Sequence, residues 1–186
     1  SGDPRFASVA VDDIEGGRIA AEHLLAGGRR RLAFIGGPVS LRQVADRLSG
    51  AQSAVSAAGA TIEFIATDGL SVEEGRRAGA RILQRSPQAR PDAVFAANDL
   101  LALGALQTLV MTGDARVPED IALIGYDDID FAAAAVIPLS SVRQPAALIG
   151  STAVDLLLRG QHGDTSENEH VLFRPELVAR ASTLGR

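Results

Sequence analysis

Three polar residues in this chain have the types and the spacing of a site for a small polyhydroxylated molecule. Arg47 carries a guanidinium that can grip a pair of ligand oxygens with two parallel hydrogen bonds. Asn98 offers both a donor and an acceptor, and the Asp127 carboxylate can accept hydrogen bonds from two hydroxyl groups. Each residue also has an ordinary alternative, namely a solvated helix arginine, a helix cap and a turn residue. The three form a site only if folding brings them together.

The segment that precedes Asp127 predicts a strand buried on both faces. Val117-Pro118 indicates a turn, and residues 121–124 are an unbroken apolar run of strand length. Gly125 then lets the chain turn, and Asp127 and Asp128 follow. In open α/β sheets, ligands bind in the crevice at the carboxyl ends of the strands. These two acids are therefore expected to face such a crevice.

The rest of the first 138 residues alternates between strands and helices. Apolar runs predict strands at 32–35, 61–66 and 92–96, and a shorter run covers 9–11; helices are expected over 16–27, 43–58, 72–85 and 99–112. This alternation predicts an α/β fold, a doubly wound and mostly parallel sheet with helices on both faces. Small or polar residues follow the strand ends, so a polar rim is expected there, within reach of Arg47 from the first turns of its helix.

After residue 138 the pattern changes. Residues 139–143 are expected to be extended, and Pro145 fits the first turn of a helix over 146–159 that carries apolar residues at helical spacing. Two short strands are predicted at 171–173 and 177–179.

Composition excludes several classes of chemistry. The 186 residues include no cysteine, so disulfides, zinc–thiolate sites and thiol nucleophiles are ruled out. All 18 basic residues are arginine, which removes Schiff-base chemistry and the lysine of a phosphate-binding loop. The net charge is −5 and the one cationic run, 29–31, is expected to be a solvated turn, so this chain should not bind DNA by itself. No apolar run reaches the length of a membrane span.

Enzyme motifs were not found. The sequence has no G-x-S-x-G, H-E-x-x-H, G-x-x-x-x-G-K or G-x-G-x-x-G. Carboxylates such as Asp127 and Asp128 could act as acid and base in a hydrolase, but no nucleophile is placed beside a base. The three histidines, His23, His162 and His170, are expected to be surface residues. The sequence thus predicts no enzyme, no cofactor and no metal site.

Several motifs, in order and spacing, resemble one family along nearly the whole chain. They are Val11-Asp12-Asp13 with Gly16-Gly17-Arg18; Arg31 to Pro38; Arg47-Leu48-Ser49-Gly50; Ala97-Asn98-Asp99 with the helix that follows; Val117 to Asp128; and Pro138 to Pro145. As a set they are similar to the effector-binding domain of LacI-type transcriptional regulators. Such regulators have an N-terminal helix-turn-helix, a hinge and a two-lobed domain that resembles periplasmic sugar-binding proteins. The ligand lies between the lobes and changes their orientation, which controls operator binding by the dimer.

The resemblance implies roles for individual residues. Arg47, Asn98 and Asp127 would contact the effector, and Asp12 joins them in the expected set. Leu70 falls where family members often place an aromatic side chain that stacks on the ligand, and Ala51 also replaces a common aromatic. Because leucine provides no stacking platform for a sugar ring, the usual hexose ligand is in doubt.

The resemblance also implies a domain map. Residues 1–14 would be a crossing segment from the first lobe, 15–138 the second lobe, 139–170 a crossing strand, a returning first-lobe helix and a loop, and 171–186 a return to the second lobe. The chain would then be N-terminally truncated, lacking the DNA-binding headpiece and most of the first lobe. The apolar stripe of helix 146–159 would lack its usual sheet, so we expect this helix to dock on another copy or to be poorly ordered.

A homodimer is the expected assembly. The helix over 99–112 is apolar nearly all round, which indicates a second partner besides the sheet, and the run 132–137 is a further apolar surface. The interface residues predicted on this helix are Leu101, Leu106, Leu109 and Val110. The function predicted is a cytoplasmic sensor that binds a sugar, polyol or nucleobase and changes operator affinity through a headpiece outside this chain. A solute-binding protein of a sugar transport system is the alternative.

Overall fold

The computed structural model describes residues 7–161 and 169–184. Its strands are β1 (Ser8–Val11), β2 (Arg31–Gly36), β3 (Thr61–Ala66), β4 (Ala93–Ala96), β5 (Ala122–Asp127), β6 (Ser140–Arg143), β7 (His170–Phe173) and β8 (Glu176–Val178). Its helices are α1 (Asp13–Ala26), α2 (Arg42–Ala57), α3 (Val72–Leu83), α4 (Asp99–Thr112), α5 (Asp130–Ala133), α6 (Ala146–Gln161) and α7 (Ala181–Leu184), with a 3-10 turn at Pro87–Ala89.

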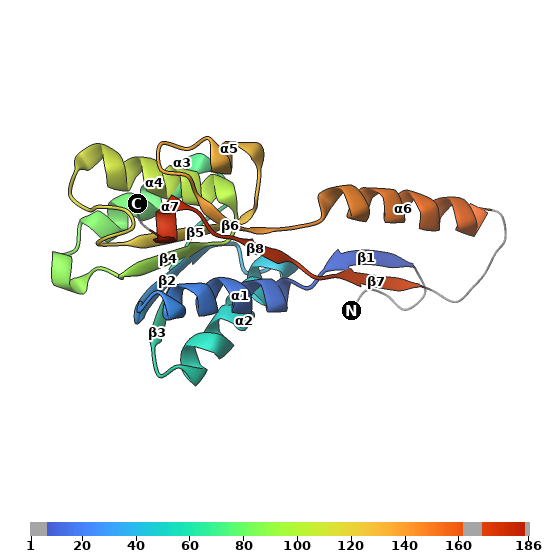
Figure 1. Ribbon diagram of the computed structural model, residues 1–186, viewed down its shortest axis with the longest axis horizontal. Helices are drawn as coiled ribbons and strands as arrows, with labels where there is room; N and C mark the ends of the chain where they lie inside the picture. Colours follow the sequence, from blue (N-terminus) through green and yellow to red (C-terminus); the bar gives the residue numbers. More distant parts are fainter. Residues whose placement is uncertain (1–6, 162–168, 185–186) are drawn as a thin grey trace.

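The main sheet has six strands in the order β3-β2-β4-β5-β6-β8. All neighbouring pairs are parallel except β6 and β8, which run antiparallel. Helices α1 and α2 cover one face of this sheet, and α3 and α4 cover the other (Figure 1). The predicted α/β fold with a doubly wound, mostly parallel sheet is therefore confirmed. Because β2, β4 and β5 are parallel, their carboxyl ends lie at a common edge of the sheet, where the polar rim was expected.

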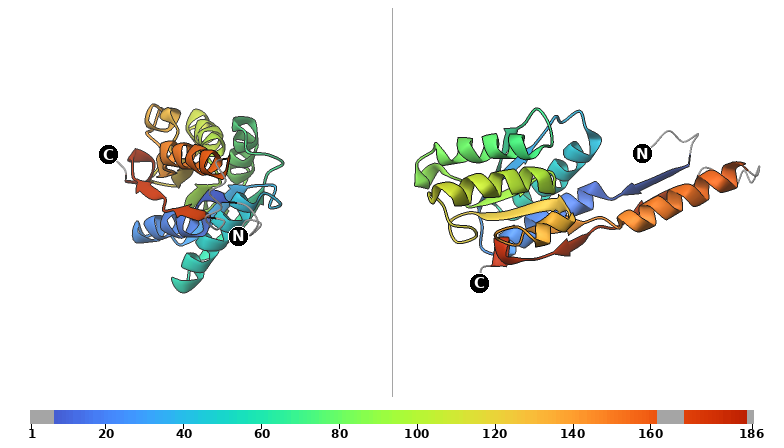
Figure 2. Two further views of the ribbon diagram at one scale, coloured as in Figure 1. Left: turned by 90° about the vertical axis from the view of Figure 1, so that its right-hand side faces the viewer. Right: turned by 90° about the horizontal axis from the view of Figure 1, so that it is seen from above.

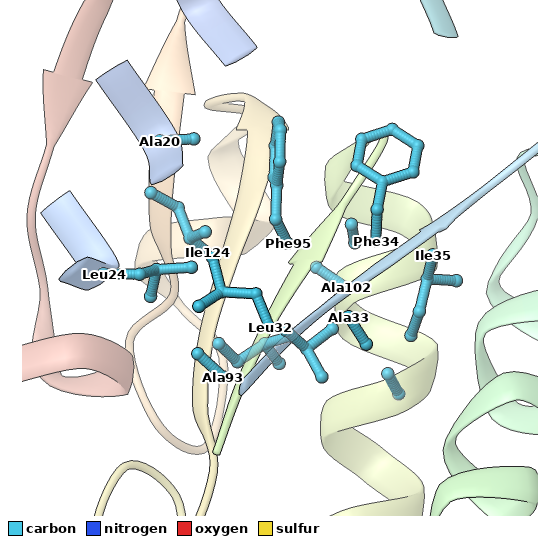
Figure 3. Packing of buried hydrophobic residues seen from close by; sticks show 14 of the residues in the cluster. Ala20, Leu24, Leu32, Ala33, Phe34, Ile35, Ala93, Phe95, Ala102 and Ile124 are labelled. Carbon is cyan, nitrogen blue, oxygen red and sulfur yellow. The ribbon is translucent and has the colours of Figure 1, made fainter. Parts of the chain in front are cut away.

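The hydrophobic core lies on both faces of the central strands. Figure 3 shows side chains from α1, α4 and the strands gathered in this cluster, among them Leu24, Ala102 and Ile124. Phe34 of β2 and Phe95 of β4 pack edge to face with their ring centroids 5.1 Å apart. Because β4 is buried along its whole length, its apolar run is unbroken, as is typical of a parallel strand covered on both faces.

Glycines allow α1 and α2 to approach each other closely. A Cβ added at Gly17 of α1 would lie 1.9 Å from the carbonyl oxygen of Arg47, and one added at Gly50 of α2 would lie 1.9 Å from that of Ile14. Real Cβ atoms do not approach backbone oxygens so closely, so only glycine fits at these two positions. This contact fixes where along α1 the Arg47 backbone lies.

Helix α4 corrects part of the dimer prediction. Leu101, Leu106 and Leu109 are at most 1% exposed and pack inside this chain, so they do not lie on a surface open to a partner. The physical reason is that α4 has a second neighbour in α3, at a distance only glycine permits: a Cβ at Gly104 would lie 2.0 Å from the Val72 carbonyl oxygen. Val110 is half-buried at the edge of this packing.

The segments outside the main sheet project from it together. Strands β1 and β7 form a separate parallel pair, and α6 runs beside β1 (Figures 1 and 2). Helix α6 forms over 146–161, but its apolar residues Leu148 and Leu157 are 55% and 64% exposed. Docking of α6 on another copy therefore stays a prediction. Residues 1–6, 162–168 and 185–186 of the expected domain map, including His162, lie outside the described residues.

Three short elements were not expected from the sequence: the 3-10 turn, α5 and α7. Helix α7 is tied to the sheet, because the Ser182 hydroxyl donates to the Leu123 carbonyl oxygen at 2.6 Å. The neighbouring Thr183 hydroxyl lies 2.7 Å from Nε2 of His23. His23 is thus half-buried rather than a plain surface histidine, and burial lowers its pKa.

Candidate functional site

Arg47 lies at the centre of the polar rim and is almost completely buried. Its side chain is 7% exposed, its Nε donates to Asp13 Oδ1 at 2.8 Å, and its Nη1 donates to the Ala97 carbonyl oxygen at 2.7 Å. These two contacts come from the start of α1 and from the end of β4. The alternative of a solvated helix arginine is wrong, because the guanidinium is held inside the fold.

The Tyr126 ring packs against the guanidinium of Arg47. The guanidinium carbon lies 3.6 Å from the centre of the Tyr126 ring, close enough for a strong cation–π contact. The ring is fully buried, and a Cβ at Gly16 would lie 2.2 Å from its hydroxyl oxygen. Burial, with help from the Asp13 carboxylate, raises the pKa of Tyr126, so it stays neutral. Among the described residues, no well-formed hydrogen bond satisfies this hydroxyl.

Asp127 reaches the same point from the end of β5. Its Oδ1 lies 3.7 Å from Arg47 Nη1 and accepts a hydrogen bond from Gln144 Nε2 at 2.5 Å. The Asp127 side chain is 30% exposed, so part of the carboxylate faces solvent. Burial raises the pKa of Asp127, while Arg47 and Gln144 act in the opposite direction. The site thus pairs a fixed cation with a partly open acceptor.

Asn98 combines the cap and the positioning of a neighbouring loop. Its Oδ1 accepts from the Leu101 backbone N–H at 3.0 Å, which caps α4, and its Nδ2 donates to the Leu70 carbonyl oxygen at 3.1 Å. Asn98 therefore joins the loop after β3 to the end of β4. It stands beside Ala97, whose carbonyl oxygen binds Arg47, so the structure brings Arg47, Asp127, Asn98 and Leu70 to one edge of the sheet.

Asp12 is committed to a local role. Its Oδ1 accepts from the Glu15 backbone N–H at 2.9 Å and caps α1. The residue that reaches Arg47 is its neighbour Asp13, which the sequence analysis did not single out. Tyr126 and Gln144 were missed as well. The available signal was their place beside residues already chosen, one at the end of β5 and the other after β6.

Asp128 is not free to act as an acid or base. Its Oδ2 accepts from Arg143 Nε at 2.7 Å, and its Oδ1 accepts from Arg180 Nη1 at 2.6 Å. Burial alone would raise its pKa, but these two guanidinium groups outweigh burial and lower it. Asp128 fastens β6 and the chain before α7 to the end of β5. This ion-pair network leaves the hydrolase alternative without its second carboxyl group.

An open hollow of about 610 Å³ adjoins the site. It lies between the paired strands β1 and β7 and the first turns of α2, and Asp13, Arg42 and Asp46 are among its lining residues. Asp13 thus contacts both Arg47 and this hollow. No described helix is long and apolar enough to cross a membrane. Within the described ranges, no three acidic or histidine side chains are grouped as metal ligands would be.

The fold and this rim define a class: ligand-binding domains whose site lies at the carboxyl edge of a parallel sheet, beside strands that cross out of it. The family model for the periplasmic binding protein-like domain matches residues 21–183. The chain belongs to this family, and the relatives it matches over its whole length are regulators of the LacI family.

Three of these similarities illustrate the match. The HTH-type transcriptional regulator CelR of Thermobifida fusca is 38% identical over 176 residues, covering 94% of this chain and 51% of CelR. A LacI family transcriptional regulator from Enterococcus faecium, solved with bound ribose, superposes with a TM-score of 0.90 at 28% identity, covering 98% and 67%. A dimeric Lac repressor superposes with a TM-score of 0.88 at 30% identity, covering 99% and 66%. The chain spans about half the length of curated relatives such as CelR, PurR and the ribose operon repressor, which are transcriptional regulators and not enzymes.

Proposed function

We propose that this chain is the effector-binding part of a LacI-type transcriptional regulator that works in the cytoplasm. Its ligand is a small polar molecule, namely a sugar, a polyol or a nucleobase. The observation that carries the proposal is the pair Arg47 and Asp127, which offers a fixed donor and a partly open acceptor 3.7 Å apart. Vicinal hydroxyl groups can accept from one and donate to the other. Bound ribose in the Enterococcus faecium relative supports this class of ligand.

The effector would act through the segments that leave the sheet. Asp13 lies two residues after the end of β1, and Gln144, which binds Asp127, comes directly after β6 and before α6. In the proposed domain map, 1–14 and 139–170 cross to a first lobe and 15–138 and 171–186 form the second. The last boundary is corrected by β7, which pairs with β1 outside the main sheet, so the chain returns to the second lobe only after Phe173. A ligand that favours one lobe arrangement over another would change operator affinity by that difference in binding free energy. Operator DNA would be bound by a headpiece outside this chain.

The ligand proposal is tested by thermal unfolding of the chain with and without D-ribose, followed by a wider set of sugars, polyols and nucleobases. A ligand should raise the midpoint of the chain, because binding to the folded state alone stabilises it. Asp127→Asn should abolish the rise. Asp114→Asn, at the exposed opposite edge of the sheet, serves as the matched control and should keep it. An equal rise in all three proteins would contradict the proposed site.

Homodimer formation is the second part of the proposal. Met111, Phe131 and Val136 are 85%, 72% and 72% exposed, which is unusual for large apolar side chains. Val136 also lines an apolar hollow of about 400 Å³ with Val110. The dimeric Lac repressor supports a pairing of this kind. Sedimentation velocity should give a dimer, Val136→Asp should weaken it, and Glu63→Gln on the edge strand β3 should not. A monomer at high concentration would count against the assembly.

A further inference from the structure

Asp99 is a buried carboxyl group that binds the chain around Asp127 without lying in the rim itself. It is the first residue of α4 and is 0% exposed. Its Oδ2 accepts from the Ile129 backbone N–H at 2.9 Å, and its Oδ1 accepts from the Ser141 hydroxyl at 2.7 Å. That hydroxyl oxygen accepts in turn from the Asp128 backbone N–H at 3.0 Å. Asp99 is therefore linked, directly and through Ser141, to two consecutive amides.

The turn that these bonds hold has a backbone that side chains rarely adopt. Asp127 and Asp128 have φ angles of +104° and +54°. Such angles disfavour residues with a Cβ and persist only where the surroundings enforce them. Room for the carboxyl group comes from Gly125, since a Cβ there would lie 2.1 Å from Asp99 Oδ1. Residues from α4, β5 and β6 thus combine to bring one carboxyl group beneath the turn.

We propose that Asp99 is a positioning residue for effector binding, whose carboxyl group holds the 127–129 turn so that Asp127 faces the ligand. The inference deepens the proposed function and rests on it for the role of Asp127. Asp99 acts through the turn and does not touch the ligand. The hold on the turn itself can be measured without any ligand.

The electrostatic surroundings of Asp99 place its titration near neutral pH. Burial raises the pKa of Asp99 to about 7; the bonds from Ser141 and Ile129 oppose the rise, and the charges of Asp127 and Asp128 add to it. Arg143 and Arg180 pair with Asp128, and Arg47 lies near Asp127, so both neighbouring acids carry compensating cations. A carboxylate accepts hydrogen bonds more strongly than a neutral carboxyl group, so the links to the turn weaken on protonation.

The hydrogen bonds between Asp99 and the 127–129 turn are tested by NMR on the isotope-labelled chain between about pH 5.5 and about pH 8.5. The Asp99 carboxyl carbon and the Asp128 and Ile129 amides should titrate with one midpoint near neutrality. Exchange of these amides, corrected for intrinsic pH dependence, should speed up about tenfold on protonation, as for a bond weakened by about 1.4 kcal/mol. In Asp99→Asn the amides should no longer titrate, whereas the exposed control Asp130→Asn should behave as the parent. Amides that stay constant, or that titrate unchanged in Asp99→Asn, would overturn the proposal.

A second variant keeps the test open if Asp99→Asn does not fold. Ser141→Ala removes the hydroxyl that joins Asp99 to the Asp128 amide and leaves the direct bond from Ile129 to Asp99, so exchange should speed up at Asp128 more than at Ile129. Equal exchange at both amides, matching the parent chain, would refute the network.

The binding consequence is measured by calorimetry with D-ribose as the probe. Affinity should be about tenfold lower near pH 6 than near pH 8, in step with the loosened turn, and Asp99→Asn should bind equally at both. Ribose bound equally by the parent at both pH values, while the amides titrate, would show that the turn does not position Asp127 and would overturn the proposal. A chain that binds none of the sugars, polyols and nucleobases tested, while its amides titrate, counts against the proposed function and not against the hold of Asp99 on the turn.

Discussion

Replacing Gly50 with alanine tests whether the close approach of α1 and α2 positions Arg47. Gly50 lies inside α2, less than one turn after Arg47. An added Cβ would lie 1.9 Å from the Ile14 carbonyl oxygen and 2.9 Å from the Arg18 backbone nitrogen. Both neighbours are backbone atoms of α1, so no side-chain rotation relieves the overlap. The two helices would have to move apart.

Two effects of opposite sign compete in this variant. Alanine stabilises a helix interior by about 1 kcal/mol relative to glycine. Against this, relief of the overlap requires a shift of roughly 1.5 Å to reach ordinary contact between a carbon and an oxygen. Overpacking of a core costs about 1–3 kcal/mol, and a shift of this size loosens the contacts along both helices. We therefore expect Gly50→Ala to lower the free energy of unfolding by about 2 kcal/mol, because the steric effect exceeds the gain in helix propensity.

Urea unfolding measures this change, with Gly150→Ala as the matched control. Gly150 also lies inside a helix, α6, but among the described residues no atom outside its chain neighbours and the backbone of α6 lies within 4 Å of an added Cβ. The control should be as stable as the parent chain or slightly more so. Effector affinity should fall for Gly50→Ala alone, because Arg47 moves with α2. A Gly50→Ala chain as stable as the parent would refute the argument that this helix contact is rigid.

Three further predictions concern the buried groups of the site. Arg47→Met should lower the free energy of unfolding by about 3 kcal/mol and abolish ligand binding, because it leaves Asp13 without its buried partner. The control Arg77→Met, on the exposed face of α3, should do neither. Tyr126→Phe should raise the free energy of unfolding by about 1 kcal/mol in urea titrations, since it removes a buried hydroxyl without a well-formed hydrogen bond; a clear loss would show that the hydroxyl is satisfied. Burial raises the pKa of Asp99 to about 7, so the folded chain binds more protons than the unfolded chain. Protonation weakens the links to the turn but relieves the larger cost of burying a charge, so the contribution of Asp99 to the free energy of unfolding should fall by about 3 kcal/mol as pH rises from about 4 to about 7. The difference in unfolding free energy between the parent and Asp99→Asn should show that slope.

The elements of the main sheet could be predicted because local signals agree with burial. The apolar run at 121–124 and the alternation of strands and helices predicted a parallel sheet. The helix expected over 99–112 does end at Thr112, where Gly113 follows with a φ of +70°. The short helices α5 and α7 were missed, since four residues give no helical periodicity. Their positions depend on distant contacts, such as that between Ser182 and Leu123.

Helix α4 shows where a sequence pattern leaves two structures open. A helix that is apolar nearly all round needs two partners, but the pattern does not say whether the second is another helix of the chain or another copy. Gly75 and Gly104 carried the missing information, because each lies against the backbone of the other's helix. Spacing of glycines within two successive helices could have favoured α3 over a second copy.

The sequence could predict that the site residues lie at one edge of the sheet, but it could not predict which residues they bind. Parallel strands bring Asn98 and Asp127 to one edge, which follows from topology alone. The contacts of Arg47 with Asp13 and Tyr126 depend on the glycine contacts that set α2 against α1, and no local pattern reports side-chain direction. The positions of these residues after the strands predict that they lie at this edge. The packing of the helices determines which of their side-chain atoms are in contact there.

A bound ligand and the segment that contains Gln144 would compete for the carboxylate of Asp127. Arg47 is held on two sides by Asp13 and Ala97, so its position changes little whether or not a ligand is present. Asp127, in contrast, is shared with Gln144, which immediately precedes Pro145 and the projecting helix α6. A ligand hydroxyl that donates to Asp127 approaches the carboxylate that Gln144 already occupies. Only a ligand with different affinities for two arrangements can shift their populations. We therefore propose that this shared acceptor links occupancy of the site to the direction of the departing segment.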